Sequence, residues 1–338
     1  MALTAAVSTA ADTVRVDDAT RAEIVTTLAQ KIDEEYVFPD KAKLVVARLN
    51  AQQQRGAYAK LVEPEQLAAA LTADLREPTN DLHLRVRFSA EPIPEDTPDA
   101  EPDPEMLKQM QGRLKDDNFG VHKVDTLAGN IGYIDLRMFA PLEFAKETIA
   151  TTMQAVADRD ALIIDLRANG GGDPSTVAFM TSYLVDQRTH LNDMYWRREG
   201  RVDEFWTQDD VPGKRFGGQK KIYVLTSKKS FSGAEEFGYN LKQLKRATLV
   251  GETTGGGAHP GGVERLHKHF TVFIPGGRAI NPISKTNWEG TGVIPDVPVA
   301  AEDALITAER LALQELLAAS RDAAQRERLR KRIEELGS

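Results

Sequence analysis

Hydrophobic residues follow a helical spacing near both ends of the chain. Within residues 18–77, apolar side chains recur three and four positions apart, as at Ile24 and Leu28, and this spacing predicts helices. The segment 82–88 instead alternates apolar and polar side chains, which predicts a strand with one buried face. Residues 303–336 return to helical spacing and end in a highly charged stretch, so we expect a helical tail with a solvated end.

The middle of the chain alternates between strand and helix patterns. Residues 131–136, 161–166 and 222–226 are apolar runs, and each is followed by a segment with helical spacing. Runs that are apolar almost throughout are typical of parallel strands covered on both faces. Strands separated by helices predict βαβ units, so the fold class is α/β, with a helical subdomain before a layered core.

Changes in composition divide the chain into five parts. Residues 1–17 are small and mildly apolar and resemble the end of a secretory signal without its basic start, so we expect a leader or truncated signal. Residues 18–90 form the N-terminal subdomain. Residues 91–118 hold five prolines and many acids, which favours a solvated linker or flap. Residues 119–302 form the core, and residues 303–338 form the tail.

Composition excludes several classes of function. The net charge of −8 argues against a surface that binds nucleic acid or anionic membrane. The chain has no cysteine, which excludes disulfides, thiolate nucleophiles and cysteine metal sites. No apolar run reaches the length that a membrane span requires.

Ser232 lies between an apolar strand pattern and a helix pattern, in the stretch TSKKSFSGAEEF. One interpretation is an N-cap, with Glu235 completing a capping box. The other is a nucleophile, because a helix N-terminus favours developing negative charge and the N–H of Gly233 can donate to an oxyanion. Ser230 is a rival nucleophile in the same stretch.

A glycine loop follows the second apolar run, in the stretch DLRANGGG. It is either a flexible turn or a source of a second oxyanion donor, the N–H of Gly170 or Gly171. A phosphate-binding loop is disfavoured because no Walker lysine follows and the GxGxxG spacing is absent.

A serine nucleophile needs a general base, and the residues alone do not choose one. His83 lies beside Asp81 at the predicted strand start, and His259 lies in a glycine-rich loop. His267 and His269 alternate on a predicted strand, but with no third ligand nearby we expect no metal site. The six histidines are His83, His122, His190, His259, His267 and His269.

Four segments together resemble the S41 peptidases, a family that includes tail-specific proteases, the tricorn core protease and interphotoreceptor retinoid-binding protein. TSKKSFSGAEEFGYNLKQLKRATLVGETTGGGAHPGG resembles the nucleophile region, and IGYIDLRMF resembles the first core strand. ALIIDLRANGGG resembles the oxyanion-loop strand, and NWEGTGVIPDVPV resembles the closing motif. The resemblance covers roughly residues 18–310. It implies a crotonase- or ClpP-like core of stacked βαβ units without a PDZ domain, since residues 91–118 are too short and polar for one.

The resemblance also implies a set of site residues. Tail-specific proteases carry a lysine about 25 residues after the serine, and residues 255–259 hold none. The tricorn-like branch uses a histidine before the core and a glutamate before the closing motif, which match His83 and Glu289. The implied triad is therefore Ser232, His83 and Glu289, with oxyanion donors in Gly233 and in Gly170 or Gly171. Two alternatives stay open: His83 as a structural partner of Asp81, and Glu289 as a ligand of a peptide amino terminus or a plain surface carboxylate.

The resemblance implies a serine peptidase that acts on peptides or unfolded protein termini through an acyl-enzyme, with no cofactor. The alternatives are a binding module for an apolar ligand and an esterase or amidase with the same triad. We further expect export to a periplasmic or extracellular location, although a cytoplasmic one stays open. The charged C-terminal helix suits homo-oligomer contacts, and residues 91–118 suit a lid.

Overall fold

The computed structural model describes residues 15–95 and 104–337, and most of the predicted leader lies outside these residues. The chain divides into two compact units. The N-terminal unit runs to residue 98 and also takes residues 261–276, and the second unit holds the rest. Within the described residues, no helix is long and apolar enough to cross a membrane.

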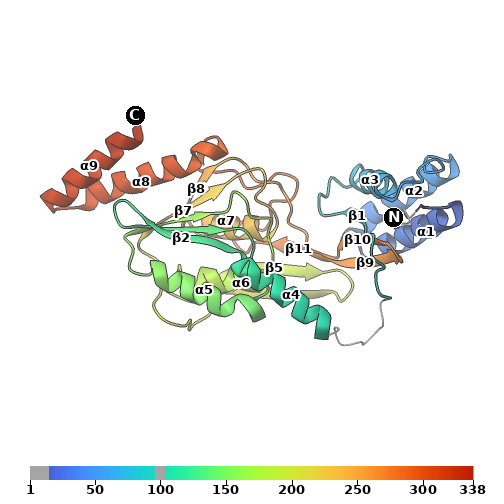
Figure 1. The fold of residues 1–338 in the computed structure, drawn as a ribbon, viewed down its shortest axis with the longest axis horizontal. Coiled ribbons are helices and arrows are strands. Elements are labelled where there is room, and N and C mark those ends of the chain that lie inside the picture. The colour runs from blue at the N-terminus through green and yellow to red at the C-terminus, as the bar shows by residue number, and fades with distance from the viewer. Residues whose placement is uncertain (1–14, 96–103, 338) are drawn as a thin grey trace, which may run out of the picture. The chain divides into compact units, whose positions relative to one another are not determined.

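The N-terminal unit packs three helices with a small antiparallel sheet (Figure 1). Proline in the first turn begins two of the helices, where its missing N–H costs nothing. The sheet has the strand order β1-β10-β9. Its elements are α1 (Asp18–Glu35), α2 (Pro39–Gln54), α3 (Pro64–Arg76), β1 (Arg85–Phe88), β9 (Gly261–His267) and β10 (Phe270–Pro275).

The second unit is built on a six-stranded sheet with the order β12-β8-β7-β4-β3-β2, parallel except for β2. A smaller antiparallel sheet, β11-β5-β6, accompanies it. The large sheet comprises β2 (Val121–Leu127), β3 (Ile131–Leu136), β4 (Ala161–Asp165), β7 (Lys221–Thr226), β8 (Thr248–Gly251) and β12 (Val297–Pro298), and the small one β5 (His190–Trp196), β6 (Arg201–Trp206) and β11 (Gly277–Ile280).

Both faces of the large sheet are buried, which explains its apolar strands. In β4, Leu162 and Ile164 face a core shared with three helices, whereas Ile163 faces a second core. Helices α5 (Leu142–Val156), α6 (Pro174–Ser182) and α7 (Gly233–Gln243) supply the first core. Helices α8 (Ala304–Ala319) and α9 (Ala323–Gly337) supply the second, on the opposite face (Figure 1). The predicted α/β class is therefore confirmed, and the buried face of α8 makes the first half of the tail part of the core.

Three local predictions differ from the structure. The strand predicted from Leu82 begins at Arg85, because the backbone N–H of His83 donates to Oδ1 of Asp81 at 3.0 Å and forms a turn. Residues 104–116, in the predicted linker or flap, form helix α4, none of whose residues is buried. Residues 261–276, placed by sequence in the core, form a hairpin that belongs to the N-terminal unit.

Candidate active site

Two loops leave the same edge of the large sheet in the second unit. Strands β4 and β7 are parallel neighbours, with Asp165 opposite Leu225, so their carboxyl ends lie together. The glycine loop 166–172 follows β4, and the turn 227–231 follows β7 and leads to Ser232, the N-cap of α7. This edge of an open parallel sheet is the usual place for a binding or catalytic site.

The glycine loop is packed directly against Ser232. A Cβ atom added at Gly171 would lie 2.7 Å from Cβ of Ser232 and 2.8 Å from the nitrogen of Gly233. The backbone N–H of Phe231 also donates to the carbonyl of Asn169 at 3.1 Å. The structure thus brings together the serine, Gly233 and the glycine loop, as the sequence predicts, and only glycine allows this approach at position 171.

Ser232 has a strained backbone. Its φ of 53° and ψ of −120° lie in a region that residues with a side chain rarely adopt. Such strain persists only where the surroundings hold it, and it is concentrated at functional sites. Ser232 is half-buried at the positive end of α7, where negative charge is stabilised.

The rival serine has a structural role. Ser230 is 1% exposed, and its Oγ donates to the carbonyl of Leu166 at 2.7 Å while accepting from the N–H of Ser227 at 3.0 Å. Because both of its hydrogen-bonding functions fasten the β7 turn to the glycine loop, Ser230 is a poor candidate for the nucleophile.

The N–H groups of the glycine loop are not equivalent. The N–H of Gly171 donates to Oδ1 of Asn169 at 2.8 Å, and Nδ2 of Asn169 donates to the carbonyl of Leu136. Gly171 therefore already has an acceptor for its N–H. Gly170 is exposed, and it stays the other predicted oxyanion donor of this loop.

Glu235 connects Ser232 to a third loop, residues 254–259. Its carboxylate is fully buried and accepts four hydrogen bonds. One comes from the N–H of Ser232 at 2.8 Å, and the others come from Oγ1 of Thr254 at 2.5 Å, Gly256 N–H at 2.6 Å and Gly257 N–H at 2.8 Å. Burial raises its pKa, and these hydrogen bonds oppose the increase. Sequence analysis gave Glu235 only a capping role. The Ser-x-x-Glu spacing, followed downstream by Thr-Gly-Gly, is the sequence pattern that could have indicated the contact between Glu235 and the third loop.

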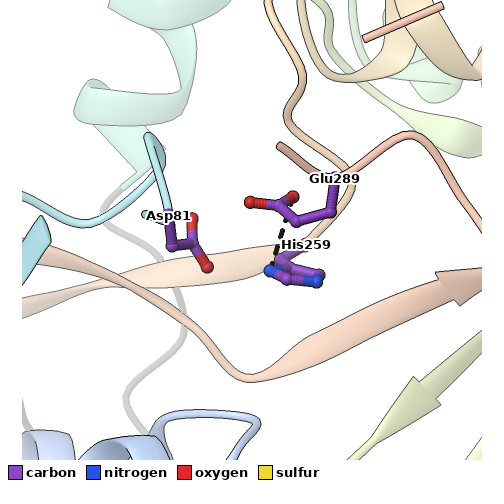
Figure 2. A group of neighbouring side chains, drawn as sticks. All are labelled: Asp81, His259 and Glu289. Carbon is purple, nitrogen blue, oxygen red and sulfur yellow. Dashed lines mark ion pairs between the residues drawn. The ribbon is translucent and has the colours of Figure 1, made fainter. Parts of the chain in front are cut away.

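The third loop carries a histidine–carboxylate pair. Nδ1 of His259 lies 3.4 Å from Oε2 of Glu289, and the N–H of Ala258 donates to the same oxygen at 2.6 Å (Figure 2). Nε1 of Trp288 donates to the carbonyl of Gly257 at 2.7 Å. His259 is 4% exposed. Sequence analysis left His259 among six candidates, and no local pattern indicated its pairing with a residue thirty positions away.

His83 belongs to the N-terminal unit. Its ring stacks on Phe273 with centroids 5.7 Å apart, and its Nδ1 lies 3.8 Å from Oδ1 of Asp81. Asp81 is fully buried and accepts from the hydroxyl of Tyr36 at 3.2 Å. The ring is thus oriented within its own unit, and its action on Ser232 stays a prediction.

A comparison with protein-family models identifies the chain. The model described as "Peptidase family S41" matches residues 130–299, and the model described as "N-terminal domain of Peptidase_S41 in eukaryotic IRBP" matches residues 4–116. The chain belongs to peptidase family S41.

Solved structures show the same fold. A putative peptidase from Parabacteroides merdae is 20% identical with a TM-score of 0.58, covering 89% of this chain and 98% of its own. A lipoprotein from Streptococcus agalactiae is 14% identical with a TM-score of 0.55, covering 87% and 96%. The tricorn protease is 14% identical with a TM-score of 0.51, covering 94% of this chain and 37% of its own.

The glycine loop provides a stability test. Gly172 has a φ of 138° and forms a bridge to Phe139, so a Cβ would lie 1.9 Å from the Phe139 carbonyl oxygen. We expect Gly172→Ala to lower the free energy of unfolding by about 3 kcal/mol or more. Gly170→Ala has no such neighbour and should cost less than about 1 kcal/mol. Urea denaturation measures both, and equal losses would contradict this description of the loop.

Glu236, in the first turn of α7, is a buried acid outside the set of predicted site residues. It is 2% exposed, and burial raises its pKa to about 8, with a further contribution from Asp173. The native state therefore keeps the proton at pH values where the unfolded chain has lost it. Stability contributed by this group is greatest below its ordinary pKa and falls as pH rises toward 8.

Replacing this acid should remove that pH dependence. In Glu236→Gln, the midpoint of thermal unfolding should fall less between pH 5 and pH 8 than in the wild type, because the side chain at this position no longer has to remain protonated. Glu65→Gln, an exposed change in the first turn of α3, is the control. Parallel pH profiles for the wild type and Glu236→Gln would show that the carboxyl is not protonated in the native state.

Proposed function

We propose that the protein is a serine peptidase that hydrolyses peptides or unfolded protein termini through an acyl-enzyme formed on Ser232. One observation carries the proposal: in a member of a peptidase family, this serine occupies a strained turn at a helix N-terminus, packed against a glycine loop. Ser232 is partly exposed, and we assign to backbone N–H groups of the turn and the glycine loop the stabilisation of the charge that a carbonyl oxygen acquires.

The proposed roles follow from the chemistry of acyl transfer. Oγ of Ser232 attacks the scissile carbonyl carbon while a general base accepts its proton, and the base returns that proton to the leaving amine. We assign the base to His83 and its orienting carboxylate to Glu289. Gly233 and Gly170 donate to the oxyanion. Water then attacks the ester carbonyl, and the acid product and Ser232 are released.

A lysine base has no support in this chain. The segment 255–259, where the resemblance places the lysine of tail-specific proteases, reads Gly-Gly-Gly-Ala-His. Its backbone instead donates to two carboxylates, Glu235 and Glu289. This supports a Ser-His-Glu site over a Ser-Lys site.

Labelling with a fluorophosphonate probe tests the proposal. We expect the probe to modify Ser232 in the wild type, to leave Ser232→Ala unlabelled, and to react at least about 100-fold more slowly with His83→Ala, because the base is lost. Ser230→Ala should keep its labelling provided that it folds, as judged by thermal unfolding. Mass mapping of the labelled peptide identifies the serine.

Two outcomes would overturn the proposal. A folded wild type that does not react with the probe, and that co-purifies with an apolar ligand, would indicate a binding module. Rapid hydrolysis of short esters without hydrolysis of unfolded casein would indicate a small-molecule esterase with the same nucleophile. Removing the Ser232 hydroxyl should itself cost only about 1 kcal/mol of stability, so a large loss of folding is not expected.

A further inference from the structure

His259 and Glu289 form a buried pair that the proposed triad uses only in part. The side chain of His259 is 4% exposed and that of Glu289 is 17% exposed. Two consecutive residues contact Oε2 of Glu289. The N–H of Ala258 donates to it at 2.6 Å, and Nδ1 of His259 lies 3.4 Å from it. Because a carboxylate accepts only, this close contact favours the hydrogen of His259 on Nδ1.

The segment around Glu289 is clamped to the loop that carries His259. The N–H of Gly290 donates to the carbonyl of Gly256 at 2.9 Å, and Trp288 donates to Gly257. The N–H of Glu289 donates to Oδ1 of Asn287 at 3.0 Å. The backbone of Glu289 is therefore fixed, and the hydrogen bond from Ala258 and the ion pair with His259 restrict its carboxylate.

A continuous set of contacts connects this carboxylate to the nucleophile within one unit. The N–H of Ser232 binds Glu235, and Glu235 binds the N–H groups of Gly256 and Gly257. The next two residues of that loop bind Glu289. The position of the Glu289 carboxylate relative to Ser232 is thus set by one loop, and His259 is the only side chain of residues 255–259 that contacts Glu289.

We propose that His259 is a positioning residue, whose Nδ1–H holds the Glu289 carboxylate in the orientation that the triad requires. This inference rests on the proposed function and adds to it a residue that acts through Glu289. It differs from a second general base, because the role requires only the hydrogen on Nδ1 and no proton acceptor at Nε2. The function needed is one donor at the position of Nδ1, which an uncharged amide can also supply.

Two amide substitutions separate these roles. Asparagine places its amide nitrogen close to the position of Nδ1, whereas glutamine places its amide near the position of Nε2. Both are polar and of similar size to the imidazole, so their effects on folding should be comparable. Thermal unfolding of each variant checks this, and His122→Asn, an exposed change on β2, is the control for loss of a histidine.

The substitutions of His259 are expected to change kcat more than KM. With unfolded casein as substrate, His259→Asn should retain kcat within about threefold, and His259→Gln should lose about 10- to 100-fold, as partners that orient a site residue commonly do. KM should change little in either. Because His259 acts through Glu289, the double variant His259→Gln, Glu289→Gln should be no slower than Glu289→Gln alone. Probe labelling rates of Ser232 should follow the same order.

Other results would overturn the inference. If the Asn and Gln variants lose activity equally, His259 takes part in proton transfer itself. If His259→Gln keeps the wild-type kcat, or if the two losses are additive, it does not act through Glu289. These outcomes require an active wild type. A folded wild type that neither labels nor hydrolyses casein overturns the proposed function, and this inference with it.

Discussion

The candidate site depends on one buried carboxylate. Glu235 is fully buried and accepts four hydrogen bonds, and a buried carboxylate with fewer donors would be strongly destabilising. Its position three residues after Ser232 lets it reach back to the strained turn. Its other donors come from a loop that follows a different strand. The same glutamate that caps α7 therefore also connects Ser232 to the loop 254–259.

The glycine loop is needed because it packs closely against the turn that carries Ser232. Glycine-loop and nucleophile backbones approach so closely that a Cβ at position 171 would overlap Ser232. The parallel sheet makes this approach possible, because neighbouring strands deliver both loops to one edge. Buried strands carry both loops, and the strained φ of Ser232 is held between them and Glu235.

The sequence predicted those features that arise from regular periodicity. The apolar runs of β3, β4 and β7 follow from burial on both faces, and the convergence of the glycine loop with Ser232 follows from parallel pairing of adjacent strands. Family resemblance rather than periodicity singled out Glu289. The pairing of Glu289 with His259 could not be predicted from the sequence. Both residues lie in irregular segments, whose path depends on individual hydrogen bonds that involve Glu235 and Trp288.

Two further local details have the same physical origin. An Asp81 side chain that captures a backbone N–H converts the start of an alternating pattern into a turn, so the strand begins three residues late. The N–H of Gly171 is taken by Asn169, a side chain that the motif DLRANGGG does not distinguish from a solvent-exposed polar residue.

The division of the chain into units also separates two parts of the proposed chemistry. Ser232, the glycine loop, Glu235, His259 and Glu289 all belong to the second unit, where strands and buried hydrogen bonds fix them. His83 belongs to the N-terminal unit, where Asp81 and Phe273 orient its ring. The contacts described for Ser232, Glu235 and Glu289 lie within the second unit. Under the proposed mechanism, substitutions at His83 are expected to change proton transfer, whereas substitutions in the loop 254–259 are expected to change the geometry of the nucleophile and of Glu289.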